Sequence, residues 1–251
     1  MTRLVAEDLV KSFAGVHAVR EVGLRLDAGE RLAVIGPNGA GKSTLFAMLG
    51  GQLRPDGGRV RLDGRDVTGL AAHRLWRLGV GRTFQVAAVF GSMTVAENVQ
   101  TALLSRLGRL GRVWRAARHQ ERIPAMALLQ RVGMAAQADR PAGVLAYGDL
   151  KRLELAVALA HEPRLLLMDE PTAGMAPAER HGLMELVDDL VAEREMGLLF
   201  TEHDMDVVFA HAERVVVLAR GEVIAEGTPD AIRRDEQVRA VYLGQGVGEA
   251  A

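Results

Sequence analysis

The sequence contains no cysteine among its 251 residues, so it has neither a disulfide nor a thiolate ligand for a metal ion. It also lacks a long apolar run. The longest runs, such as Leu165–Met168, are only a few residues, whereas a membrane-spanning helix needs about 18 or more. No signal-peptide pattern follows Met1. These absences predict a soluble, cytoplasmic chain whose role at a membrane has to be exercised through a partner.

An excess of charge of either sign is missing as well. The formal net charge is −1, with 31 Lys and Arg residues against 32 Asp and Glu residues. This balance gives no electrostatic reason to expect nucleic acid or an anionic membrane as a ligand. Lysine itself is rare, because Lys11, Lys42 and Lys151 are the only three. Apolar residues make up 49% of the chain, which is ordinary for a globular protein.

Four short apolar segments, bounded by polar residues or glycine, read as strands covered on both faces: 32–35, 164–168, 197–200 and 214–218. The segments between them show apolar residues at helical spacing, as in residues 183–191. Alternation of strands and helices predicts an α/β fold with a mostly parallel sheet. Ligands of such folds bind near the carboxyl ends of the strands.

The remaining segments predict two further regions. Residues 3–10 and 17–26 read as antiparallel strands around a turn at Ala14-Gly15, and residues 58–64 add a third strand ending at Asp63-Gly64. Residues 86–160 are mostly helix-like, and Thr94 with Glu97 forms a candidate capping box. We therefore expect one domain over 1–243, with a helical subdomain at about 86–160, and a flexible Gly-rich tail over 244–251.

Arginine is concentrated in one part of the helical region, residues 105–122, where it alternates with apolar side chains. One interpretation is an exposed amphipathic helical hairpin. The other is a surface that touches lipid headgroups or a membrane partner. The sequence leaves both open.

A complete phosphate-loop motif occupies residues 36–43, with Thr44 following: Gly36-Pro37-Asn38-Gly39-Ala40-Gly41-Lys42-Ser43. An apolar strand runs into it and a helical stretch leaves it, as this motif requires. The glycines let backbone N–H groups surround phosphate oxygens, and the helix N-terminus adds positive potential. Lys42 would then reach the β and γ phosphates, and the Ser43 hydroxyl would ligate Mg²⁺.

A second motif is a pair of acids, Asp169 and Glu170, at the end of a buried strand. Successive side chains of a strand point to opposite faces, so the two acids are expected to do different jobs. One would reach Mg²⁺, and the other would face the γ-phosphate and polarise a water molecule. Pro171 prevents the strand from continuing.

At this point the residues resemble the ATP-binding subunits of ABC transporters, in order along nearly the whole chain. Arg82-Thr83-Phe84-Gln85 occupies the place of that family's Q-loop, and Leu145-Ala146-Tyr147-Gly148-Asp149 that of its signature sequence. Ala173-Gly174-Met175 stands at the D-loop, His203 at the switch histidine, and Phe13 where an aromatic ring stacks on adenine. The resemblance implies a P-loop NTPase core with a mostly parallel sheet, an antiparallel β lobe and a helical subdomain.

The resemblance also implies an activity, the hydrolysis of ATP with Mg²⁺, coupled to transmembrane transport. It implies catalytic roles for Glu170, His203, Lys42 and Gln85, and Mg²⁺ contacts from Ser43, Gln85 and Asp169. The nucleotide would contact Phe13, the phosphate loop with Thr44, and Tyr147 with Gly148 of a second subunit. That subunit is either a second copy or a sister ATPase. The remaining partners are transmembrane permease subunits, which would hold the chain at the inner face of the cell membrane.

Two positions depart from the family signature. Ala146 stands where serine is common, which removes a hydroxyl donor to phosphate, and Asp149 stands where glutamine is common. A negative charge at Asp149 opposes anion binding by Coulomb repulsion. Alternatively, Asp149 serves the N-terminus of the following helix as a capping acid. The first alternative predicts a weaker ATP-closed dimer than in relatives with the full signature.

Within the family, the chain looks most like ATPases of branched-chain amino acid importers, on the segments 82–85, 171–177, 226–229 and 241–244. ATPases of urea importers and of lipopolysaccharide exporters are the alternatives within the family. Outside it, the alternatives are a soluble P-loop NTPase or kinase, and an ABC-type ATPase of DNA repair or translation. The order of Gln85, Gly148, the acid pair and His203 argues against the first of these. The single unit and balanced charge argue against the second.

Overall fold

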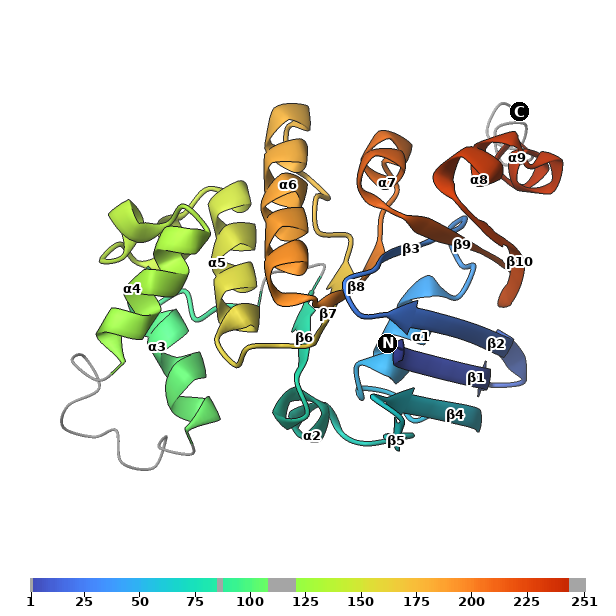
Figure 1. The fold of residues 1–251 in the computed structure, drawn as a ribbon, viewed down its shortest axis with the longest axis horizontal. Coiled ribbons are helices and arrows are strands. Elements are labelled where there is room, and N and C mark those ends of the chain that lie inside the picture. Colours follow the sequence, from blue (N-terminus) through green and yellow to red (C-terminus); the bar gives the residue numbers. More distant parts are fainter. Residues whose placement is uncertain (1, 85–87, 108–120, 244–251) are drawn as a thin grey trace.

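The computed structural model describes residues 2–84, 88–107 and 121–243 (Figure 1). Its larger sheet has six strands in the order β10-β9-β3-β8-β7-β6. They are β3 (Arg31–Ile35), β6 (Val80–Thr83), β7 (Leu165–Asp169), β8 (Gly197–Thr201), β9 (Arg214–Ala219) and β10 (Glu222–Gly227). Neighbouring strands pair in parallel, except that β10 pairs antiparallel with β9 at one edge. The predicted mostly parallel α/β core is confirmed.

Four of these strands are predicted from the sequence, whereas β6 and β10 are not. β6 is only four residues long and contains Gly81 and Arg82, so it shows no apolar run. β10 carries exposed glutamates near its two ends, Glu222 and Glu226. It forms an antiparallel hairpin with β9 at the edge of the sheet. Short or edge strands bury too little surface to leave an apolar signature.

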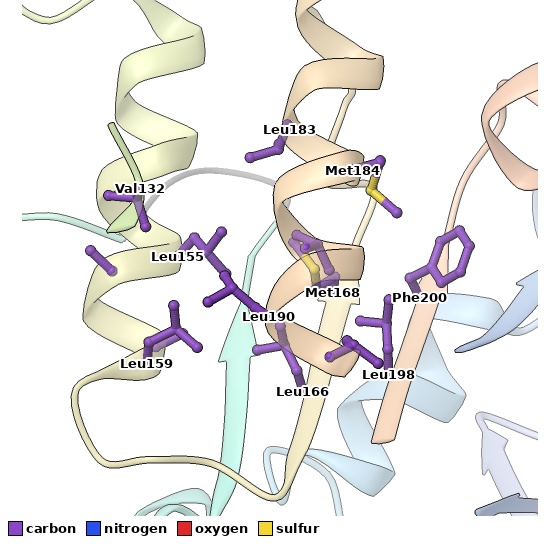
Figure 2. Close-up of a cluster of buried hydrophobic side chains, with 14 of the residues drawn as sticks. Val132, Leu155, Leu159, Leu166, Met168, Leu183, Met184, Leu190, Leu198 and Phe200 are labelled. Atoms are coloured by element: carbon purple, nitrogen blue, oxygen red, sulfur yellow. The ribbon is translucent and has the colours of Figure 1, made fainter. Parts of the chain in front are cut away.

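The central strands are apolar throughout because both faces of the sheet are covered. On β3, Ala33 and Ile35 belong to one hydrophobic cluster, whereas Leu32 and Val34 belong to another. The pleat of a strand sends alternate side chains to opposite faces, so each cluster covers one face. Figure 2 shows the first cluster, in which strand residues face α5 and α6; the labelled members include Leu155, Leu159, Leu166, Met168, Leu190, Leu198 and Phe200.

A smaller antiparallel sheet has the order β2-β1-β4-β5 and contributes to the second cluster. Its strands are β1 (Thr2–Phe13), β2 (Val16–Asp27), β4 (Gly57–Leu62) and β5 (Arg65–Asp66). Ala14 and Gly15 both have positive φ, 46° and 84°, as a two-residue hairpin turn requires. The predicted antiparallel lobe and its turn are confirmed.

The helical region contains α3 (Val95–Arg106), α4 (Arg122–Arg131) and α5 (Tyr147–Leu159). The predicted capping box is present: the Glu97 amide donates to Thr94 Oγ1 at 3.2 Å, and the Thr94 amide donates to Glu97 Oε2 at 2.9 Å. Most of the Arg-rich segment 105–122, namely 108–120, lies outside the described residues, as does the predicted tail 244–251.

Helix α5 is buried more widely than the sequence predicts. The sequence predicts a helix from near Gly148 with Leu150, Leu153, Val157 and Ala160 on its buried side, but in the structure Leu150 and Val157 are only partly buried. The buried residues instead surround most of the helix: Lys151, Leu153, Glu154, Leu155, Ala156, Ala158 and Leu159. The reason is that α3, α4 and β6 all pack against α5, so a single apolar stripe does not describe it.

The described residues also form two short 3-10 helices, Ala135–Gln137 and Ala142–Val144, and six further α-helices: α1 (Lys42–Leu49), α2 (Ala72–Arg77), α6 (Pro177–Arg194), α7 (Met205–His211), α8 (Pro229–Arg234) and α9 (Glu236–Leu243). In Figure 1, α5 and α6 stand side by side, and α1 lies behind the strands β1 and β2. Among the described residues, no helix is both long and apolar enough to cross a bilayer.

Candidate active site

The phosphate loop, residues 36–43, leaves the end of β3 and leads directly into α1. Gly36 and Gly41 have φ values of 150° and 104°. A Cβ at Gly36 would lie 2.1 Å from the carbonyl oxygen of Leu218, and a Cβ at Gly41 would lie 2.4 Å from that of Ala18. Only glycine adopts this backbone without a clash, and the resulting loop directs N–H groups toward an anion. The loop therefore has the shape that a phosphate cradle needs.

Lys42 is buried inside this loop. Its Nζ donates hydrogen bonds to the carbonyl oxygens of Gly36, at 2.6 Å, and Pro37, at 3.1 Å. Burial lowers the pKa of Lys42, and the carboxylates of Glu170 and Asp169 oppose that shift. The cation of the phosphate loop and the acid pair therefore share one electrostatic environment.

The acid pair is arranged differently from the simple strand alternation expected for it. β7 ends at Asp169, and Glu170 has a φ of 49°, which is left-handed rather than extended. The turn, and not the strand pleat, therefore aims the Glu170 side chain. A positive φ at a residue with a side chain costs on the order of 1–3 kcal/mol and is characteristic of functional sites. The two acids contact different side chains, Thr201 for Asp169 and His203 for Glu170.

Thr201, at the end of β8, organises both acids. Its Oγ1 donates to Asp169 Oδ1 at 2.8 Å and accepts from the Glu170 amide at 3.0 Å. The Thr201 side chain is fully buried. No local pattern in the sequence indicates a role for Thr201, because its partners are about thirty residues away.

His203 follows β8 and lies against Glu170. Its Nε2 is 2.8 Å from Glu170 Oε1. The His203 side chain is half-exposed, whereas that of Glu170 is 14% exposed. A histidine beside a largely buried carboxylate, next to a loop shaped for phosphate, can orient both a phosphate oxygen and an attacking water. The structure thus brings together two residues that the sequence places 33 positions apart.

Arg82 is a second residue that the sequence analysis does not single out chemically. Its guanidinium is 3.9 Å from Asp169 Oδ2 and donates to the Phe46 carbonyl oxygen at 3.0 Å. Burial lowers the pKa of Arg82, and the charge of Asp169 opposes that shift. Arg82 is on β6 and Thr201 is on β8, the two strands that flank β7. The two residues therefore approach Asp169 from opposite sides, and Arg82 balances its charge.

Gln85 lies outside the described residues, but both ends of its segment are held by α5. Glu154 Oε1 accepts from the Phe84 amide at 2.8 Å and from the Ala88 amide at 3.4 Å. Lys151 Nζ donates to the Phe84 carbonyl oxygen at 2.6 Å. Burial raises the pKa of Glu154, and the Phe84 amide and Lys151 oppose that shift.

Phe13, Tyr147 and Gly148 come from two other parts of the fold, β1 and α5. Phe13 ends β1 at the hairpin turn and is 49% exposed. Tyr147 and Gly148 begin α5, where a Cβ at Gly174 would lie 3.4 Å from the Tyr147 ring and one at Gly148 3.4 Å from Met175. In Figure 1, α5 and α1 lie on different sides of β7 and β8, so the start of α5 does not face the phosphate loop of its own chain.

The residues present suit Mg²⁺ bound together with a phosphate ligand. Among the described residues, no cluster of three or more His, Cys, Asp or Glu side chains could hold a metal ion by itself. Mg²⁺ commonly uses one or two carboxylates and completes its shell with substrate phosphates and water. Asp169 and the exposed hydroxyl of Ser43 would provide such a partial set.

Comparison with known families and proteins gives a consistent result. Residues 19–173, more than half of the chain, match the ABC transporter family, and residues 222–248 match the branched-chain amino acid ATP-binding cassette transporter family. The chain is 39% identical to the high-affinity branched-chain amino acid transport ATP-binding protein BraF of Pseudomonas aeruginosa, covering 98% of this chain and 100% of that protein. It is 35% identical to the lipopolysaccharide export system ATP-binding protein LptB of Haemophilus influenzae, covering 98% of each.

Solved structures are similar over the same length. The ADP conformation of an ATP-binding cassette of an ABC transporter superimposes with a TM-score of 0.88 at 32% identity, covering 97% of this chain and 99% of that one. A dimeric, post-hydrolysis cassette bound to ADP and phosphate superimposes with a TM-score of 0.78 at 26% identity, covering 90% and 98%.

Proposed function

The chain belongs to the ABC transporter family as an ATP-binding subunit, and from this we propose that it hydrolyses ATP to drive import of branched-chain amino acids or related solutes. The observation that carries the proposal is the contact of 2.8 Å between Glu170 and His203 beside the phosphate loop. The match of residues 222–248 to the branched-chain family favours this solute class over lipopolysaccharide.

In this proposal the reaction is ATP plus water to ADP plus phosphate. Glu170 polarises a water molecule whose oxygen bonds to the γ-phosphorus, while the bond from that phosphorus to the bridging oxygen breaks. His203 holds a γ-phosphate oxygen, and Lys42 neutralises charge on the β and γ phosphates. Bound Mg²⁺ would supply further charge neutralisation between these phosphates. Ser43, Gln85 and Asp169 would hold it, and Thr201 and Arg82 keep the Asp169 carboxylate in place.

A second ATPase subunit would complete the site, whether a copy of this chain or a sister subunit. Within one chain the start of α5 rests on residues 174–179 and not on the phosphate loop. The free N–H groups of an α-helix N-terminus attract phosphate, so Tyr147 and Gly148 would serve the nucleotide of the opposite subunit. The dimeric relative bound to ADP and phosphate supports such an assembly.

The membrane partner would be a transmembrane permease, which would hold the chain at the inner face of the cell membrane. We assign its docking segment to a groove of about 320 Å³ next to the described end of the Q-loop. Its lining includes Trp76, Phe84 and Ser105, from α2, the loop after β6, and α3. An amphipathic permease segment in this groove would touch Phe84, which Lys151 and Glu154 connect to α5.

ATP turnover by the purified chain, without any added small molecule, tests the activity. Glu170→Gln should lower kcat by about 100-fold or more while leaving ATP binding intact, because an amide cannot polarise the water as a carboxylate does. Equal turnover by wild type and Glu170→Gln would refute the assignment. Co-purification with the permease, followed by uptake of labelled leucine and of a control sugar into proteoliposomes, tests the solute class.

A further inference from the structure

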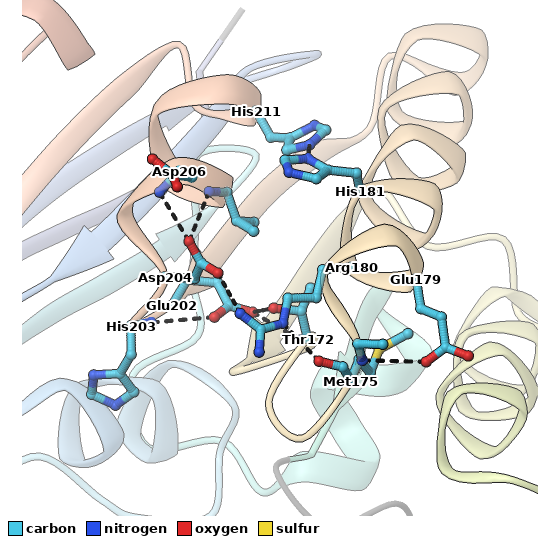
Figure 3. A network of polar contacts seen from close by, with 12 residues as sticks. Thr172, Met175, Glu179, Arg180, His181, Glu202, His203, Asp204, Asp206 and His211 are labelled. Atoms are coloured by element: carbon cyan, nitrogen blue, oxygen red, sulfur yellow. Dashed lines mark hydrogen bonds and ion pairs between the residues drawn. The ribbon is translucent and has the colours of Figure 1, made fainter.

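Three polar connections join the segment after β7 to the segment after β8, and Figure 3 shows the two that are made by Glu202 and by Arg180. The first is the contact between His203 and Glu170. The second is made by Glu202, whose Oε1 accepts from the amide and hydroxyl of Thr172 at 2.8 and 2.7 Å. The third is made by Arg180, from the first turns of α6, and the mechanism described above does not use it.

Arg180 bridges the two segments with separate nitrogen atoms. Its Nε donates to the Met175 carbonyl oxygen at 2.8 Å, and its Nη1 forms an ion pair with Asp204 Oδ2. The other oxygen of Asp204 caps α7, accepting from the amides of Asp206, at 3.0 Å, and Val207, at 3.4 Å. Asp204 directly follows His203 and is the N-cap residue of α7. The Arg180 guanidinium therefore holds the residue next to His203 in place.

The ion pair is present at neutral pH. Burial by itself would raise the pKa of Asp204, but the hydrogen bond from Arg180 and the Val207 and Asp206 amides outweigh it and lower the pKa. A planar guanidinium holds two acceptors in fixed directions, which an ammonium cannot do. The geometry of Arg180 is therefore suited to setting a position and not only to balancing a charge.

We propose that Arg180 is a positioning residue for ATP hydrolysis: by tying Asp204 to the Met175 carbonyl, it sets the place of His203 relative to Glu170. This inference rests on the proposed function, in which these two residues act on ATP. Glu202 is the stronger connection, but it is 3% exposed, and removing a buried charge partner destabilises a fold. The Arg180 side chain is 30% exposed, so its loss should leave the fold intact.

The test compares steady-state ATPase kinetics of the full-length wild type with four single variants. Arg180→Met and Asp204→Asn each remove the ion pair, and asparagine preserves the cap of α7. Both should lower kcat by about 10-fold to 100-fold, the loss expected from a misplacement of about 1 Å, with KM for ATP within about twofold of wild type. Arg180→Lys keeps the charge but not the fork, so kcat should stay at least about fivefold below wild type.

The matched control is Arg3→Met. The Arg3 guanidinium, on β1, also bonds one carboxylate, Asp63 at 2.7 Å, and one backbone carbonyl oxygen, that of Glu195 after α6 at 3.3 Å. It should change Tm about as much as Arg180→Met and leave kcat unchanged. The double variant Arg180→Met/Asp204→Asn should have the kcat of either single variant, because both break the same connection.

A readout without ATP separates this inference from the proposed function. In the nucleotide-free protein, the His203 side-chain NMR signal, assigned with His203→Gln, should shift in Arg180→Met and Glu170→Gln but not in Arg3→Met. An unmoved signal in Arg180→Met overturns the inference even if the wild type hydrolyses no ATP. Three kinetic results would also overturn the inference. They are an unchanged kcat in Arg180→Met, a change in that variant that is confined to a higher KM, and a loss of activity that follows the loss of Tm across all variants. Absent turnover in the wild type with the expected NMR shift would instead reject the proposed function alone.

Discussion

Two buried threonine hydroxyls of the larger sheet should respond in opposite ways to the same substitution. Thr201 Oγ1 is bonded to Asp169 and to the Glu170 amide. Thr83 Oγ1, on β6, is buried and has no hydrogen-bond partner among the described residues. Valine has nearly the shape of threonine without the hydroxyl. Thr201→Val therefore removes two hydrogen bonds, whereas Thr83→Val removes an unsatisfied polar atom.

The magnitudes follow from the environment of each partner. A hydrogen bond to a charged group contributes about 1.5–3 kcal/mol. The Asp169 side chain is 14% exposed, so water replaces part of the loss, and the Glu170 amide keeps its bond of 3.2 Å to the Thr201 carbonyl oxygen. We expect Thr201→Val to lower the free energy of unfolding by about 1–2 kcal/mol, or Tm by roughly 3–6 °C. Thr83→Val should leave stability within about 0.5 kcal/mol of wild type or raise it.

Urea denaturation with matched thermal melts measures both variants. The ATPase assay should also show the Mg²⁺ concentration for half-maximal rate rising by about 10-fold in Thr201→Val only, because Thr201 orients a proposed metal ligand. Equal stability losses in the two variants would refute the reasoning, since the hydroxyl's partners would then not decide its contribution.

Two further predictions concern charge. Asp149 accepts a hydrogen bond of 2.9 Å from Gln137. Asp149→Gln, made in a Glu170→Gln background, should tighten ATP-dependent dimerisation about fivefold per site, because it removes a negative charge whose repulsion of the triphosphate costs on the order of 1 kcal/mol. Unchanged or weaker dimerisation in light scattering would contradict this. Burial lowers the pKa of His161 from 6.5 to about 4, so the unfolded chain takes up a proton at this residue more readily than the folded protein does. The free energy of unfolding should therefore fall as the pH drops from 6.5 toward 4. Between pH 7 and pH 5 the expected fall is about 2 kcal/mol. His161→Phe keeps a ring beside Trp76, 4.6 Å away between centroids, and should remove this part of the pH dependence in urea melts; an identical pH profile would show that His161 is not its source.

The sequence predicts the parts of the site that are contiguous in the chain. The phosphate loop carries its own evidence, because its glycine spacing, lysine and flanking strand lie within about a dozen residues. The capping box of Thr94 and Glu97 is equally local and is confirmed. The hairpin at Ala14-Gly15 is confirmed for the same reason.

The parts that the sequence does not predict arise from contacts between distant segments. Thr201 and Asp169 meet because β7 and β8 are parallel neighbours in one register, which no local pattern specifies. The Glu170 carboxylate is aimed by a positive φ that glutamate does not favour intrinsically, so only the surrounding fold explains it. Arg180 looks like any charged residue near a helix start until the fold brings Asp204 beside it.

Glu154 Oε1 accepts two hydrogen bonds, and together they limit the distance between the Phe84 and Ala88 amides. The amide nitrogens of Phe84 and Ala88 cannot be farther apart than the two bond lengths combined, although four residues of extended chain reach roughly 13 Å. The oxygen thus acts as a crosslink between two described residues of the chain, Phe84 and Ala88. Because this crosslink is anchored on α5, a displacement of that helix is transmitted to both anchor points at once.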